Sequence, residues 1–331
     1  MVWSLSNESI AGGSKWKSYS QGQIWGAEIR GLDLKETLDV EAHQTIHDGL
    51  MDHGILIFRD QDITPAQHIA FGKQFGELTI HPFSPSLPDT PELIILDNDL
   101  NNPPRLTDVW HTDETFREEP PMGTILRAVI VPQVGGDTVF ASMTAAFEGL
   151  SDSIQQFIMD LVAVHDFKPF RTLFTDSEED KKKRRRMEDL YPNPTHPVVR
   201  IHPVTGKKAL FVNSNFTIAI KGMKERESQA ILDLLFQQAH IPEYQFRVRW
   251  QPHTLVFWDN RSVQHYAVHD YYPQRRRMER VTLKGDRPTG RNPVDRGETE
   301  RKESRNAVGG ADKKHRGGQP LRPFERLVPH A

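Results

Sequence analysis

The chain contains no cysteine among its 331 residues. A disulfide, an iron–sulfur cluster and a thiolate zinc site are therefore excluded, and any metal must be held by nitrogen and oxygen ligands. Long apolar runs are also missing, since the hydrophobic segment at 54–58 is far too short to span a bilayer. The N-terminus has no basic region followed by an apolar core. We therefore expect no signal peptide, no membrane association and a cytoplasmic location.

Strong net charge is missing as well. The formal net charge is −3, which gives no general attraction to nucleic acid. One basic run, at 181–186, could suggest nucleic-acid binding or nuclear targeting. Acidic residues at 176–180 neutralise it, so we expect a solvated loop or helix there and no nucleic-acid partner.

Short segments with strand patterns outnumber helical ones, which favours a mainly β fold with α decoration. Helices are expected at residues 40–53, 64–75, 145–150, 152–164 and 225–239. Strands are expected at 23–30, 54–59, 92–96, 124–131, 138–140, 198–202, 209–212, 244–250, 254–258 and 274–283. We expect one domain over residues 1–287, with a hydrophilic insertion at about 168–196, and a flexible tail at 288–331.

A His-x-Asp triplet, His111 and Asp113, is the first candidate site. On an extended segment this spacing puts both side chains on one face, where they could bind a metal with one further ligand. His265 is a candidate for that ligand, and two His with one Asp are the ligand set of non-haem Fe(II) oxygenases. His253 and His269 are alternatives to His265, although the spacing of His269 suits a helix better than a strand. Such triplets also recur by chance, so the surrounding sequence must decide.

The predicted strand at 274–283 carries several arginines. With a period of two, Arg276 and Arg280 share one face with Met278 and Thr282. Buried arginines are costly unless each meets an anion, and a guanidinium suits a carboxylate or a sulfonate. An exposed strand with solvated charges is the alternative, and residue type alone does not decide between them.

Four blocks occur in order along the chain. They are His111-Thr-Asp113, Gly135-Gly-Asp-Thr138, Trp258-Asp-Asn-Arg-Ser-Val-Gln-His265-Tyr-Ala and Pro273-Gln-Arg-Arg-Arg-Met-Glu-Arg280. Together they closely resemble the taurine dioxygenase (TauD/TfdA) family of Fe(II)- and 2-oxoglutarate-dependent dioxygenases. The resemblance covers roughly residues 20–287. It implies a double-stranded β-helix (jelly-roll) core, and it implies Fe(II), 2-oxoglutarate and O2 as cofactor and cosubstrates.

The resemblance also implies roles for particular residues. His111, Asp113 and His265 match the metal ligands of the family. Thr138 and Arg276 match the residues that hold the distal carboxylate of 2-oxoglutarate. These five residues are therefore the expected catalytic and cosubstrate-binding set.

Three further residues match the substrate pocket of taurine dioxygenase. Arg280 matches the residue that binds the sulfonate there, and His81 and Phe216 match other pocket positions. Two positions depart from that enzyme, since Ser84 replaces a tyrosine and Thr107 replaces an asparagine that help to recognise taurine. The departures leave room for larger sulfonates, alkyl sulfate esters or aryloxyalkanoates beside taurine.

The expected reaction is hydroxylation of a small anionic organic substrate next to its heteroatom. It would release sulfite or sulfate and a carbonyl product, with succinate and CO2. A zinc hydrolase with the same ligands is one alternative, and it would not require Thr138 and Arg276. A catalytically silent β-barrel binding protein is another, against which the presence of all three ligands argues. Relatives are often dimers or tetramers, which allows a homodimer or homotetramer, and the insertion at 168–196 corresponds to a lid in relatives.

Overall fold

The structure, a computed structural model, describes residues 17–20, 25–84 and 86–291. The chain separates into two units, residues 1–290 and 291–331. From residue 292 onward, the predicted flexible tail lies outside the described residues.

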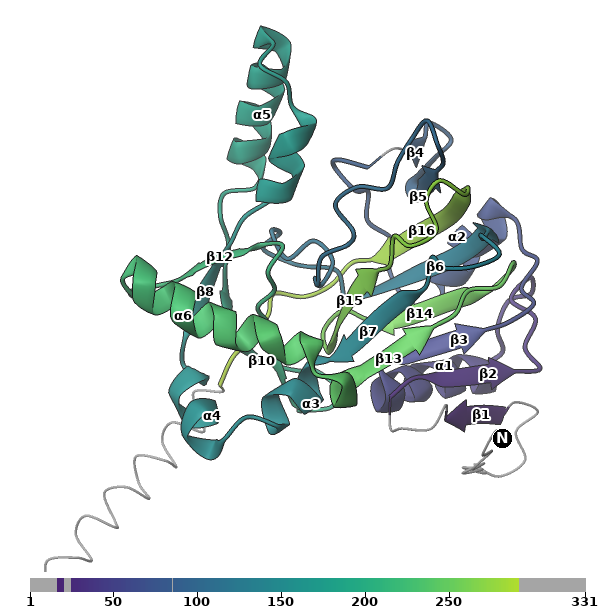
Figure 1. The fold of residues 1–331 in the computed structure, drawn as a ribbon. Coiled ribbons are helices and arrows are strands. Elements are labelled where there is room, and N and C mark those ends of the chain that lie inside the picture. Colours follow the sequence, from purple (N-terminus) through teal and green to yellow (C-terminus); the bar gives the residue numbers. More distant parts are fainter. Residues whose placement is uncertain (1–16, 21–24, 85, 292–331) are drawn as a thin grey trace, which may run out of the picture. The chain divides into compact units, whose positions relative to one another are not determined.

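Two sheets form the centre of the first unit (Figure 1). The larger sheet has eight strands in the order β1-β2-β3-β14-β6-β16-β5-β4, and only the β2–β3 pair is parallel. The smaller sheet has the order β13-β7-β15 and is antiparallel. The bounds are β1 (Lys17–Ser20), β2 (Ala27–Arg30), β3 (Ile55–Phe58), β4 (Ser86–Leu87), β5 (Thr90–Asn98), β6 (Gly123–Ile130), β7 (Thr138–Ser142), β13 (Gln245–Val248), β14 (Leu255–Asp259), β15 (Val263–Ala267) and β16 (Arg276–Leu283).

Alternate side chains of the larger sheet pack against the smaller sheet on one face and against helices on the other. On β3, Ile55 and Ile57 join a hydrophobic cluster that also contains Phe140 of β7 and Val248 of β13. Leu56 and Phe58 point the other way, into a second cluster that also contains Ile46 and Phe71. A strand buried on both faces therefore serves two cores. Two sheets with one shared core confirm the predicted mainly β, jelly-roll architecture.

Helices α1 (Val40–His53) and α2 (Pro65–Lys73) cover the outer face of the larger sheet (Figure 1). Asp39 caps α1 by accepting a hydrogen bond from the Ala42 amide at 2.7 Å. Gly54 ends it in the left-handed conformation, with φ of 70°. These local signals explain why the predicted bounds of α1 are confirmed.

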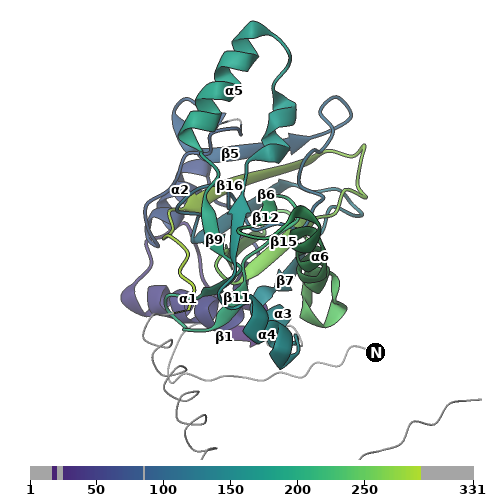
Figure 2. The same cartoon turned by 90° about the vertical axis from the view of Figure 1, so that its left-hand side faces the viewer.

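A second group of elements packs on the other side of the smaller sheet (Figure 2). It contains α3 (Met143–Glu148), α4 (Asp152–Ile158), β8 (Val162–His165), β9 (Thr195–Pro197), β10 (Val199–Ile201), β11 (Lys208–Leu210), β12 (Thr217–Ile220), α6 (Glu225–Phe236), η2 (Gln237–His240) and η3 (Pro242–Tyr244). The predicted helix at 152–164 is wrong beyond residue 158. There the chain turns and becomes β8, which pairs with β12 and β9 and buries alternate residues. Pairing with strands distant in the sequence overrides the local helical pattern.

The hydrophilic insertion forms η1 (Lys168–Leu173) and α5 (Glu178–Leu190). The basic run lies on α5, where Lys181 pairs with Glu178 at 2.9 Å and Lys183 with Glu179 at 2.8 Å. We expected a solvated loop or helix, and the segment is a helix with such i,i+3 and i,i+4 pairs. In the described ranges, no helix combines the length and the apolar character needed to cross a membrane.

Candidate active site

The backbones of His111 and His265 form a two-residue bridge at the edge of the smaller sheet. The amide of His111 donates to the carbonyl of His265 at 3.1 Å, and the reverse bond measures 2.8 Å. The two ring centroids are 4.2 Å apart. Asp113 begins a turn over residues 113–116, so the predicted extended segment is wrong at this residue. The turn still places Asp113 Oδ1 3.9 Å from His111 Nε2 and 3.8 Å from His265 Nε2.

These three residues form a compact set of donor atoms. Their ligand atoms lie within 4.8 Å of one another, and all three residues are buried. Within the described part of the chain, no other His, Asp and Glu cluster of this kind occurs. His253 instead faces Asp62 at 3.2 Å, and the Nε2 of His269 lies 2.9 Å from the hydroxyl of Thr107. The geometry therefore favours His265 as the third ligand, and its role remains a prediction.

The protonation of the two imidazoles suits metal binding. Burial lowers the pKa of His111, and burial together with His111 lowers the pKa of His265 to about 3. Both rings are neutral at physiological pH, as metal ligands must be. The Nδ1 of His111 lies 2.7 Å from the carbonyl of Val109, which only accepts, so Nδ1 carries the hydrogen. Its Nε2 lone pair is left facing Asp113, and two imidazoles with one carboxylate fit Fe(II).

Asp113 is held as a carboxylate by its surroundings. Burial acts to raise its pKa, but Arg280, His265, His111 and the hydroxyl of Thr124 together bring the pKa well below its ordinary value. Oδ1 accepts a hydrogen bond from Arg280 Nη1 at 3.0 Å. The Thr124 hydroxyl donates to Oδ2 at 2.6 Å. One oxygen is therefore occupied by a fixed hydroxyl, while the other faces the two histidines.

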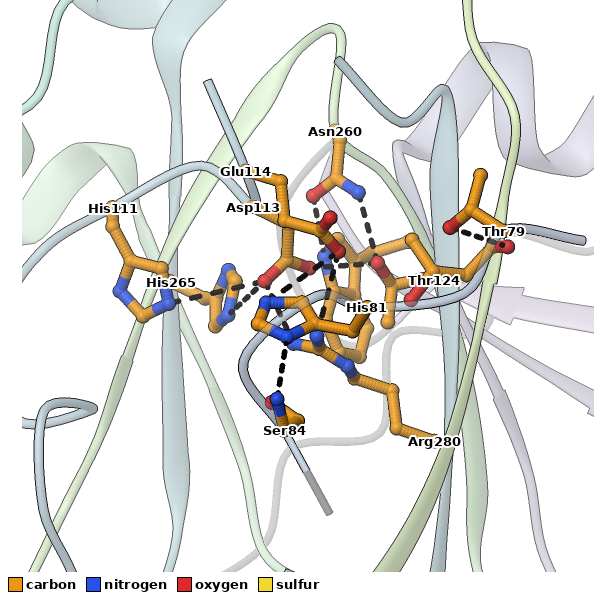
Figure 3. A network of polar contacts seen from close by, with 12 residues as sticks. Thr79, His81, Ser84, His111, Asp113, Glu114, Thr124, Asn260, His265 and Arg280 are labelled. Atoms are coloured by element: carbon orange, nitrogen blue, oxygen red, sulfur yellow. Dashed lines mark hydrogen bonds and ion pairs between the residues drawn. The ribbon is translucent and has the colours of Figure 1, made fainter. Parts of the chain in front are cut away.

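Thr124 belongs to a chain of hydrogen bonds that starts on β14 (Figure 3). The indole of Trp258 donates to Asn260 Oδ1 at 2.9 Å, and Asn260 Nδ2 donates to Thr124 Oγ1 at 2.9 Å. The Trp258 ring also packs against His265, with centroids 4.9 Å apart. The chain thus links the surroundings of His265 to the orientation of Asp113.

Replacing Thr124 by valine is expected to weaken Fe(II) binding by about 10- to 100-fold, because Asp113 loses the bond that orients it. The measurement is anaerobic titration of metal-free protein with Fe(II). Thr124→Ser keeps the hydroxyl and should retain wild-type affinity. Equal affinities for wild type and Thr124→Val would show that the hydroxyl does not orient the carboxylate.

A cavity of about 110 Å³ opens beside the histidines. Five of the predicted site residues line it, namely His111, His265, Thr138, Arg276 and Arg280. The two histidines of the predicted metal site, which we call the metal corner together with Asp113, therefore line the same cavity as the predicted cosubstrate-binding residues. His81 and Phe216 do not line this cavity.

Arg276 is buried, and its guanidinium meets no acidic side chain in the part of the chain that the structure describes. Its side chain is only slightly exposed, and its Nε donates to the carbonyl of Gly136 at 3.1 Å. The guanidinium lies 5.9 Å from the Trp250 ring and 5.7 Å from the Tyr271 ring. Among the described residues, no carboxylate comes within 4.0 Å of it. Since a buried charge requires a counterion, the cavity suits a ligand carboxylate at this end.

The predicted substrate residues His81 and Phe216 lie among aromatic rings. Phe216 belongs to a buried cluster with Phe116, and its ring meets the His111 ring edge-on, with centroids 6.2 Å apart. The ring of Phe170 in η1 lies near the His81 ring, with centroids 5.4 Å apart. The insertion therefore supplies part of the apolar wall beside His81, and its role as a lid stays a prediction.

Sequence reasoning missed four polar residues of the site. Thr124 and Asn260 form the hydrogen-bond chain to Asp113, and Arg117 pairs with Glu114. Glu114 and Asn260 lie inside the quoted blocks or next to them, which was the available signal. Nothing in the sequence distinguishes Thr124 from an ordinary strand residue. Burial raises the pKa of Glu114, opposed by Arg117 and Arg280.

The comparisons with known proteins agree on one family. The family described as "Taurine catabolism dioxygenase TauD, TfdA family" matches residues 17–282. An alkylsulfatase of Acinetobacter baylyi is 37% identical over 270 residues, which cover 80% of this chain and 84% of that protein. An alpha-ketoglutarate-dependent sulfate ester dioxygenase of Pseudomonas putida is 37% identical over 272 residues, which cover 80% of this chain and 88% of that protein. The solved structure of a taurine dioxygenase from Burkholderia xenovorans has a TM-score of 0.71 at 34% identity, covering 84% of this chain and 92% of that chain.

Proposed function

Since the chain belongs to the TauD/TfdA family of 2-oxoglutarate-dependent dioxygenases, we propose that it hydroxylates an alkyl sulfate ester or a sulfonate at the carbon next to the heteroatom. One atom of O2 enters the substrate and the other enters succinate, while 2-oxoglutarate loses CO2. The hydroxylated carbon then releases sulfate or sulfite and becomes a carbonyl group. The names of the similar proteins support this substrate class, with a sulfate ester first.

Fe(II) would be held by His111, Asp113 and His265. When bound, iron supplies the activation of O2 that is coupled to decarboxylation of 2-oxoglutarate. The protein contributes two neutral imidazoles and one carboxylate, which leaves the remaining coordination positions to cosubstrate and oxygen. The fixed tautomer of His111 and the Thr124 hydroxyl orient these donors before any ligand arrives.

The observation that carries the proposal is Arg276, a buried guanidinium that has no carboxylate partner among the described residues and lies in the same cavity as the two histidines. A dicarboxylate with one end at the metal corner would bring its other carboxylate to Arg276 and Thr138. The Thr138 hydroxyl already accepts a hydrogen bond from Trp250 at 3.0 Å, which leaves its own hydrogen to donate. A zinc hydrolase would not require this arginine, because it binds no 2-oxoglutarate.

The substrate would lie at Arg280 and His81, beside the aromatic cluster. Arg280 lies next to the predicted metal site, because its guanidinium contacts Asp113 directly. An anionic head at Arg280 would place the adjacent carbon near the metal, and an alkyl or aryl tail would face Phe216 and Phe170. Because aromatic rings form this wall, an aryloxyalkanoate is the second candidate.

The test begins with anaerobic binding of Fe(II) and 2-oxoglutarate, followed by O2-dependent succinate release. The panel contains alkyl sulfates, sulfonates that include taurine, and aryloxyalkanoates. We expect succinate release to be stimulated most by alkyl sulfates, with sulfate and aldehyde formed in equal amounts. Stimulation only by aryloxyalkanoates would select the second candidate. If 2-oxoglutarate fails to bind the iron-loaded protein, while the zinc-loaded protein hydrolyses esters without O2, the oxygenase assignment is wrong.

A further inference from the structure

Glu114 directly follows the predicted metal ligand Asp113 and is almost completely buried, at 2% exposure. Its backbone has φ of 50°, which is uncommon for a residue other than glycine. The turn directs its side chain toward Arg280 and His81, the two residues assigned to the substrate's anionic head (Figure 3). A buried carboxylate therefore lies within the site proposed for an anion.

The two oxygens of Glu114 have different surroundings. Oε2 accepts a hydrogen bond from Arg117 Nε at 2.6 Å. Oε1 is buried and accepts no hydrogen bond. It lies 3.6 Å from Arg280 Nη2 and 3.9 Å from His81 Nε2. Oε1 thus faces the donors of the substrate site without being bonded to them.

The tautomer of His81 follows from its other contacts. Its Nδ1 accepts hydrogen bonds from the backbone amides of Phe83 at 3.1 Å and Ser84 at 2.9 Å. Nδ1 therefore has no hydrogen, and the neutral ring carries it on Nε2. Burial lowers the pKa of His81 well below its ordinary value, so the ring adds a donor but no charge. His81 Nε2–H and Arg280 are the donors available to a ligand head.

The charges around this position cancel. Arg280 lies between Asp113 at 3.0 Å and Glu114 at 3.6 Å, and Arg117 is bonded to Glu114. Arg117 and Arg280 favour the ionised form of Glu114 against its burial, and two guanidinium groups are then balanced by two carboxylates before a substrate binds. Without Glu114 the same position would carry a net positive charge.

We propose that Glu114 is a specificity-determining residue that restricts the site at Arg280 to heads with a single negative charge, such as sulfate esters and sulfonates, and rejects doubly charged phosphate monoesters. The inference rests on the proposed function, because it takes the substrate head to bind at Arg280 and His81. Repulsion by the Glu114 carboxylate is proportional to the charge of the head. The repulsion therefore costs a dianion twice as much binding free energy as it costs a monoanion.

Hexyl sulfate and hexyl phosphate are the matched probes, because they share a tail and differ in head charge. At pH 8 a phosphate monoester is doubly charged, since its second pKa is about 6. Each is titrated calorimetrically, without oxygen, into protein loaded with Fe(II) and 2-oxoglutarate. Glu114→Gln should increase the affinity for hexyl sulfate by about tenfold and the affinity for hexyl phosphate by about a hundredfold, because the phosphate carries twice the charge.

Two further variants control the experiment. Glu118→Gln removes the same charge from an exposed residue that pairs with Arg287, and it should change neither affinity. Arg117→Gln removes the guanidinium that is bonded to Glu114, and it should weaken the binding of both ligands, hexyl phosphate more than hexyl sulfate. The opposite signs expected for Glu114→Gln and Arg117→Gln separate an electrostatic effect from damage to the fold.

Each remaining outcome contradicts a specific step. If the wild type binds both probes equally, or if Glu114→Gln leaves their ratio unchanged, Glu114 does not select by charge. If Glu114→Gln loses hexyl phosphate, the carboxylate accepts a hydrogen from the phosphate, and its role is the reverse of the one proposed. If the wild type binds 2-oxoglutarate but not hexyl sulfate, the substrate assignment at Arg280 fails, and the inference fails with it.

Discussion

Replacing Asp113 by alanine is expected to abolish turnover. The change removes the one anionic donor of the predicted metal set and leaves two neutral imidazoles. It also leaves Arg280 and the Thr124 hydroxyl facing the space that the carboxylate filled. We expect succinate formation to fall by about 10³-fold or more, which corresponds to about 4 kcal/mol. Substrate-stimulated succinate release at saturating Fe(II) and 2-oxoglutarate measures the effect.

A fold defect must be separated from loss of the ligand, because the largely buried Arg280 loses its hydrogen-bonded carboxylate and keeps only Glu114, at 3.6 Å. Asp113→Asn keeps the shape of the side chain and should lose turnover to a similar extent. Asp48→Ala, at an exposed position on α1, should behave as wild type. Retained hydroxylation in folded Asp113→Ala would contradict the ligand role of Asp113.

Arg276 and Arg280 of β16 are expected to have separable effects. Arg276→Ala should raise the KM for 2-oxoglutarate by about 100-fold, because it removes the only cation proposed to pair with the distal carboxylate. Arg280→Ala should instead weaken the binding of the anionic substrate far more than the binding of 2-oxoglutarate. The KM for 2-oxoglutarate and the KM for the substrate are measured for both variants.

The matched replacement is lysine at each position. Arg276→Lys keeps the charge but loses the planar fork and its contact with the Trp250 ring, so it should lie between wild type and Arg276→Ala. Equal losses of both ligands in Arg276→Ala and Arg280→Ala would mean that the two roles are assigned wrongly. A larger loss of substrate affinity in Arg276→Ala would mean that they are exchanged.

Local signals explain how much of this site could be predicted from the sequence. The period of two along 276–283 predicted that Arg276 and Arg280 share a face, and both are largely buried. The bounds of α1 were equally accessible, because Asp39 and Gly54 mark its ends. The resemblance then predicted which histidine would meet the His-x-Asp triplet, which no local pattern could do.

The remaining features depend on partners distant in the sequence. β15 was not predicted, although it contains His265, because its pairing with β7 and His111 stabilises it. β8 was predicted as helix for the same reason. The Thr124 hydroxyl and the Glu114 carboxylate acquire their roles only when the turn after His111 folds against β6 and β16. Such contacts are tertiary, and propensity does not contain them.

The backbone bridge between His111 and His265 also has a consequence for folding. The two residues are about 150 positions apart, so the bridge closes a long loop, and such contacts form late because their entropy cost comes first. We therefore expect the metal site to assemble late in folding, so that iron does not nucleate it. Iron that binds only the native protein at 100 times its Kd adds about 2.7 kcal/mol to the stability. That gain should slow unfolding and leave the folding rate unchanged.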